Sequence, residues 1–64
     1  MKCIVVCLVK GREKFNEMFD DYDSAFDYAR EKTEKDGLTS VVLYFDDNSK
    51  TWRTKVKLFP PESC

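Results

Sequence analysis

Two cysteines in one apolar segment, Cys3 and Cys7, are the first residues whose type could support chemistry. In an extended segment they point the same way and lie about 13 Å apart, which is too far for a disulfide or a shared metal ion. We therefore expect both to act as small buried apolar residues. Cys64 stands at the C-terminus, and we assign it no role.

Two groups of acidic residues are candidates for metal binding. The first is Asp20, Asp21 and Asp23, and the second is the sequence Asp46-Asp47-Asn48. Neither has the twelve-residue spacing of a calcium loop, which ends in a distal glutamate. Helix capping and turn formation explain both groups, so we expect no metal ion.

The composition argues against an enzyme. The 64 residues include no histidine, which excludes Ser-His-Asp and Cys-His catalysis and a zinc or haem site with a histidine ligand. The two glycines, Gly11 and Gly37, stand far apart, so the chain has no glycine-rich phosphate loop. A chain this short also encloses little space for a pocket. We expect a non-enzymatic protein without a cofactor.

The combination that most suggests binding is Tyr44 with Arg53, Lys55 and Lys57. If the strands that carry them pair, one aromatic ring and three cations share a face of the sheet. Modules that bind single-stranded RNA stack bases on such aromatic residues beside cations. This chain lacks the second helix and the glycine-aromatic signature of those modules, so nucleic-acid binding is the alternative to protein binding.

The apolar pattern predicts four strands and one helix in the order ββαββ. Residues 2–10 and 13–19 form one hairpin around Gly11, and residues 40–45 and 51–59 form another around a polar turn. Between the hairpins, Asp21 caps a helix over about residues 22–36, which ends at Gly37. The chain is thus a single small domain of residues 1–64, with residues 59–64, which include Pro60-Pro61, predicted as a loose C-terminal tail.

The first strand is apolar on both parities and therefore belongs in the centre of the sheet. Placing the third strand beside it gives a four-stranded antiparallel sheet of order 2-1-3-4 with the helix packed on one face, an α+β fold. The two more charged strands then form the edges, where charge discourages pairing between molecules.

One helix covers only one face of such a sheet. We expect Ile4, Val6 and Leu8 to face the helix, which leaves an apolar patch of the opposite parity that a soluble monomer rarely exposes. A second copy of the chain is the simplest cover. The residues predicted for this self-association are Cys3, Val5, Cys7, Val9, Val42 and Tyr44.

The formal net charge is −1, from 11 basic and 12 acidic residues, which argues against general nucleic-acid binding. Acidic residues gather around the start of the helix, and basic residues gather along the last strand. Such a surface can orient a protein partner. The predicted partner-binding residues are Asp20, Asp21, Asp23, Asp27, Arg53, Lys55 and Lys57.

The apolar run of residues 3–9 is too short to span a bilayer, and charged residues follow it in place of a cleavage site. We therefore expect a cytoplasmic protein with reduced cysteines. In size and charge the chain resembles small single-domain proteins of bacteriophages, many of which bind a host protein, although it shares no motif with them. The sequence predicts a protein-binding module that inhibits or adapts a larger protein and acts as a homodimer. The alternative is a small single-stranded nucleic-acid-binding protein that uses the basic last strand.

Overall fold

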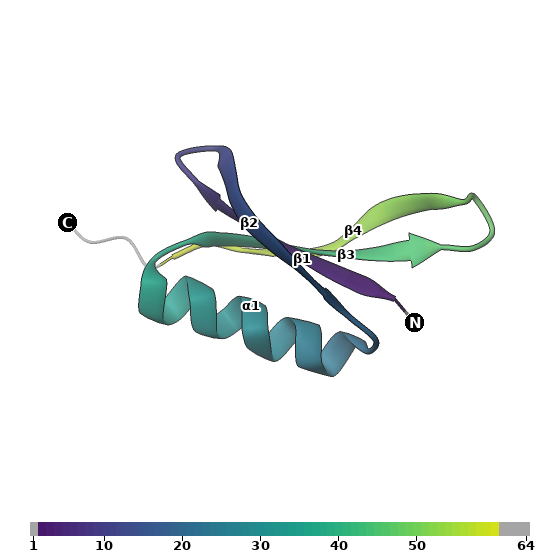
Figure 1. Cartoon of the computed structure of the whole chain (residues 1–64), viewed down its shortest axis with the longest axis horizontal. Helices are drawn as coiled ribbons and strands as arrows, with labels where there is room; N and C mark the ends of the chain where they lie inside the picture. The colour runs from purple at the N-terminus through teal and green to yellow at the C-terminus, as the bar shows by residue number, and fades with distance from the viewer. Residues whose placement is uncertain (1, 61–64) are drawn as a thin grey trace.

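The computed structural model describes residues 2–60. The element order is β1 (Cys3–Val9), β2 (Arg12–Phe19), α1 (Tyr22–Asp36), β3 (Thr39–Asp46) and β4 (Thr51–Leu58). The strands form one antiparallel sheet in the order β2-β1-β3-β4, and α1 lies across one face of it (Figure 1). This confirms the predicted fold class and strand order. Cys64 and most of the predicted C-terminal tail lie outside the described residues.

The local signals at the two ends of α1 work as predicted. The Asp21 carboxylate accepts a hydrogen bond from the backbone amide of Ser24 at 3.0 Å and so caps the first turn. At the other end, Gly37 has a φ of 69°, a left-handed conformation that glycine adopts without steric cost. The backbone amide of Leu38 then folds back to donate to the carbonyl of Lys32 at 3.3 Å.

A β-bulge interrupts the first hairpin. Cys7 of β1 pairs with Phe15 of β2, and the next residue of β1 pairs with Glu13, so Lys14 is an extra residue in the ladder. Without the bulge, the register set at the turn would place Phe15 opposite Val6. Because neighbouring residues of a strand point to opposite faces, the bulge moves the Phe15 ring to the other side of the sheet.

A second bulge interrupts the other hairpin in its outer strand. Val42 of β3 pairs with Val56 of β4, while the next residue, Leu43, pairs with Thr54. The extra residue is again a lysine, Lys55. The bulge breaks the regular alternation that the sequence of β4 suggests. Thr54 and Val56 are two residues apart, yet they lie on opposite faces of the sheet.

The core lies on the opposite face of β1 from the one that we expected. The side chains of Cys3, Val5 and Cys7 are fully buried (0% exposed) and pack with Ala25 and Ala29 of α1. The side chains on both sides of this contact are small, which lets the helix lie close to the sheet. Ile4, Val6 and Leu8 therefore point away from α1.

The predicted self-association residues are consequently assigned to the wrong face. Val42 is fully buried in the same core, and Tyr44 packs against its edge. Val9, at the end of β1, is 39% exposed. Buried side chains of this kind cannot form an interface while α1 stays in place. The physical reason for the error is that β1 is apolar on both parities, so its own sequence does not show which face meets the helix.

Among the described residues, one face of the sheet does stay uncovered, but it is the face that carries Ile4, Val6 and Leu8 and not the face that we expected. No helix or strand among residues 2–60 packs on this side of the sheet, where Met18 is 53% and Trp52 is 42% exposed. The strand register places eight apolar side chains there. We call this surface the open face, and its apolar members are Ile4, Val6, Leu8, Met18, Val41, Leu43, Phe45 and Trp52.

Adjacent valines of β1 test this assignment of faces. Val5→Lys buries an unpaired charge beneath α1, so we expect a loss of more than about 4 kcal/mol and no cooperative unfolding transition. Val6→Lys places the same charge on the open face and should cost less than about 1.5 kcal/mol. Thermal and urea unfolding followed by circular dichroism at low micromolar concentration measures both. If Val5→Lys folds and Val6→Lys does not, the assignment of the two faces of β1 is wrong.

Candidate functional site

The predicted acidic residues lie at the start of α1, and all four are exposed. Asp21 has a structural task, because its hydrogen bonds with Ser24 cap the helix and lower the pKa of the Asp21 carboxyl group. Asp27 lies 3.8 Å from the guanidinium group of Arg30 in an exposed ion pair. The remaining members, Asp20 and Asp23, flank the cap. The structure therefore brings the acidic residues together as predicted.

The predicted basic residues do not share one face of the sheet. Arg53 binds the carboxylate of Asp46 at 2.8 Å, on the side of the sheet that α1 covers. The Lys55 ammonium group lies over the ring of Tyr44 at 5.8 Å and over a second ring in α1. Lys57 pairs with a residue of the open face and points to that side.

This separation removes the arrangement that suggested RNA binding. Tyr44 lies on the helix side of the sheet, opposite Arg53. Its ring is partly buried, and the Lys55 side chain covers it. A nucleobase would have to displace Lys55 to stack there. The bulge at Lys55 causes this outcome, because it changes the face on which β4 presents its side chains.

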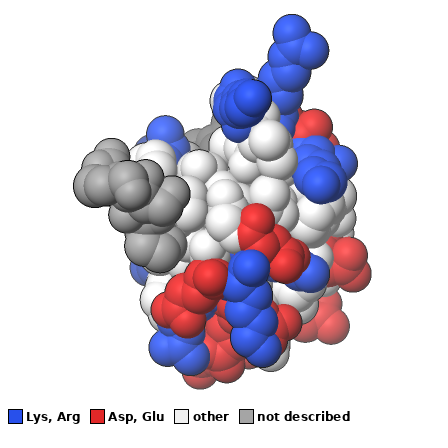
Figure 2. Space-filling model, turned by 90° about the vertical axis from the view of Figure 1, so that its left-hand side faces the viewer, with Lys and Arg blue, Asp and Glu red and all other residues white. Residues whose placement is uncertain are grey.

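The surface charge at the far end of α1 is mixed in sign. Figure 2 shows this end of the molecule, with Lys and Arg at the top over the β1–β2 turn and both signs of charge at the bottom over α1. Uncharged surface lies between them. The helix charges pair along one turn, Lys32 with Asp36 at 3.4 Å and Glu31 with Lys35 at 3.7 Å. The charge along α1 is therefore negative at its start and mixed in sign at its end.

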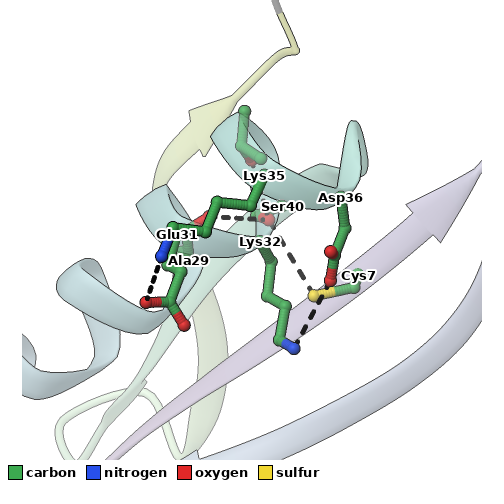
Figure 3. Close-up of polar contacts among 8 residues, drawn as sticks. Cys7, Ala29, Glu31, Lys32, Lys35, Asp36 and Ser40 are labelled. Atoms are coloured by element: carbon green, nitrogen blue, oxygen red, sulfur yellow. Dashed lines mark hydrogen bonds and ion pairs between the residues drawn. The ribbon is translucent and has the colours of Figure 1, made fainter.

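A buried polar cluster joins the second half of α1 to the sheet, and sequence reasoning missed it. The Ser40 hydroxyl donates to the carbonyl of Ala29 at 3.1 Å and accepts from the hydroxyl of Thr33 at 2.9 Å. The Thr33 hydroxyl also lies 3.5 Å from the carbonyl of Leu58. The Cys7 sulfur lies 3.8 Å from the Ser40 oxygen (Figure 3). The signals in the sequence are Thr33, which continues the spacing of Ala25 and Ala29 along one side of the helix, and Ser40, which has the same parity as Val42.

The hydrogen-bond directions in this cluster identify Cys7 as a protonated thiol. The single proton of Ser40 goes to the Ala29 carbonyl, so the thiol is the donor in its contact with Ser40. Burial raises the pKa of the Cys7 thiol above its ordinary value near 9.0, and the hydrogen bond with Ser40 and the ammonium group of Lys32 oppose this only in part. A fully buried thiol of this kind is a packing residue and not a nucleophile.

The structure offers neither a metal cluster nor a membrane-crossing helix in its described part. Within residues 2–60, no three His, Cys, Asp or Glu side chains come close enough together to hold a metal ion. The one helix of that segment has 15 residues, and none there combines the length and the apolar character that crossing a membrane requires. Comparison with protein families, with curated proteins and with solved structures finds no match to this chain.

The open face is the remaining candidate for a functional site. One row of side chains crosses all four strands, from Asn16 through Val6 and Val41 to Lys57. The amide of Asn16 donates to the carboxylate of Glu13 at 2.7 Å, which holds this acid at the β2 edge. The open face is therefore apolar in the middle, acidic at one edge and basic at the other.

The buried thiol predicts how stability changes with pH. Because the folded-state pKa of Cys7 is raised, the unfolded chain loses this proton first, and the free energy of unfolding falls as pH rises above about 9. The slope from one group is at most about 1.4 kcal/mol per pH unit. Cys7→Ala removes this contribution and should flatten the decline. Urea unfolding between pH 7 and 10 under reducing conditions measures it, and equal slopes for both proteins would contradict the assignment.

Proposed function

We propose that the chain is a non-enzymatic protein-binding module and that the open face is its binding surface. The composition of this face carries the proposal, because eight apolar side chains lie together on the side of the sheet that no helix or strand of residues 2–60 covers; seven of them are half-buried or exposed, and Val41 is buried (8% exposed). Met18 and Trp52 are the most exposed of them. Contiguous exposed apolar surface with methionine and aromatic residues is typical of protein interfaces. The partner is a protein that offers an apolar patch of its own.

The edges of the sheet are poorer docking sites than the open face. A partner strand needs an unbroken row of backbone N–H and C=O groups. Both edge strands contain a β-bulge, with Lys14 as the extra residue in β2 and Lys55 in β4. Bulges and lysines are two of the features by which sheet proteins prevent edge pairing. This supports binding through the face.

The acidic start of α1 supports a second contact. Asp23 and Asp27 lie in α1 and Asp20 lies just before it, on the far side of the sheet from the open face, so all three stay accessible when that face is covered. In this proposal they steer the module toward a larger protein that it inhibits or adapts. Charges of this kind change the association rate more than the final affinity.

Single-stranded nucleic acid is the weaker candidate. It requires accessible aromatic rings beside several cations on one surface. Here Arg53 is paired with Asp46, and Lys55 covers Tyr44 on the helix side. Of the predicted basic residues, this leaves Lys57 on the open face.

The proposal includes a cytoplasmic location. Cys3 and Cys7 are buried free thiols, although a disulfide-rich scaffold is the usual solution for small secreted domains. These two unpaired buried thiols support a reducing, cytoplasmic compartment.

Site-specific photo-cross-linking in the organism's own cells tests this function. Photoreactive p-benzoylphenylalanine replaces Trp52 on the open face or, as the matched control, the exposed Arg30 on α1. We expect protein adducts from position 52, either with another protein or with the chain itself, and fewer from position 30. Nucleic-acid adducts at position 52, or equal adducts at both positions, would contradict the proposal.

A further inference from the structure

We infer that the partner of the open face is a second copy of this chain, placed so that the two-fold axis runs parallel to the strands. This inference rests on the proposed function and adds the identity and orientation of the partner. It follows from the distribution of charge around the apolar centre of the face, where the two edges carry opposite signs.

The β2 edge of the open face is acidic because of Glu13. Its carboxylate is held by the side-chain amide of Asn16 at 2.7 Å, next to the row that contains Val6. The β4 edge is basic because of Lys57, which stands at the other end of the same row, beside Val41. Glu13 itself pairs with Leu8, but its carboxylate reaches Asn16 at the β2 end of this row, and the row then runs through two valines to the Lys57 ammonium group.

Two copies related by a two-fold axis can bring their open faces together in two ways, with the axis either parallel to the strands or across them. When two sheets meet face to face about an axis parallel to the strands, β2 of one copy lies over β4 of the other, and Glu13 meets Lys57 of the second copy twice. When the axis runs across the strands along this row, β2 lies over β2, and the Glu13 carboxylate and the Lys57 ammonium group each lie near their own copies. Opposite charges attract and like charges repel at such contacts, so the charges select the first arrangement. The face is therefore complementary to itself.

The size of the face predicts a weak dimer. Strands about 4.8 Å apart with a rise of about 3.3 Å per residue give a four-stranded face a footprint of roughly 450 Å². Two copies then bury about 900 Å² in total, close to the roughly 1,000 Å² at which specific interfaces begin. We expect a dissociation constant on the order of micromolar. In this dimer α1 of each copy lies outside, with its acidic start exposed on both outer sides.

Charge reversal tests the partner and the orientation together. Sedimentation velocity and light scattering at about 1–300 µM protein and low salt compare the wild type with Glu13→Lys, with Lys57→Glu and with the double variant. Each single reversal places like charges together at both symmetric contacts and should weaken the dimer at least about tenfold. The double variant exchanges the signs of the two charges, so the dissociation constant of its dimer should lie within about threefold of the wild-type value. Glu34→Lys, on the exposed side of α1, is the matched control and should change little.

Val6→Lys separates failure of this inference from failure of the proposed function. Two results together support the inference. Val6→Lys abolishes the dimer, and the double variant Glu13→Lys with Lys57→Glu restores the dimer that each single reversal weakens. A wild type that stays monomeric throughout overturns the second copy as partner, and adducts of position 52 with foreign proteins then still support protein binding. A dimer that Val6→Lys leaves unchanged overturns the open face as the dimer interface, and the adducts from position 52 then decide whether the proposed function also fails. A dimer that Val6→Lys abolishes but the double variant does not rescue overturns the orientation.

Discussion

The 15-residue helix α1 covers one face of the four-stranded sheet, and the rest of the described structure depends on that contact. The close approach of Ala25 and Ala29 to the sheet leaves room only for small side chains beneath, and Cys3 and Cys7 supply them. In β1, the larger side chains of Ile4 and Leu8 point the other way. The open face is thus the physical consequence of a core that one short helix can build.

The same contact explains the polar cluster at the end of the helix. Ser40 is fully buried, yet both of its hydrogen-bonding roles are satisfied by Ala29 and Thr33. Buried polar groups with complete hydrogen bonds fix the position of neighbouring elements, since an alternative packing would leave them unpaired. The cluster therefore fixes where α1 lies on the sheet, and with it which face stays uncovered.

The sequence predicted what local signals determine and failed where two β-bulges intervene. Asp21 and Gly37 define the helix ends through their own hydrogen bonds and backbone angles, so the bounds of α1 and the strand order were predictable. The face of β1 was not, because each parity of that strand is apolar. The bulge at Lys14, which carries Phe15 to the helix side, has no distinct signature in the sequence. The bulge at Lys55 also has no distinct signature in the sequence, and it places the predicted basic residues on different faces of the sheet.

The central claim is that the open faces of two copies meet. Isotope-filtered nuclear Overhauser spectroscopy on a mixture of labelled and unlabelled protein at millimolar concentration tests it most directly, because only contacts between copies give signals. The account predicts intermolecular contacts among the methyl groups of Val6, Val41 and Leu43 and none from Val5 or Val42. Intermolecular contacts confined to α1 or to the edge strands, or their absence at this concentration, would contradict it.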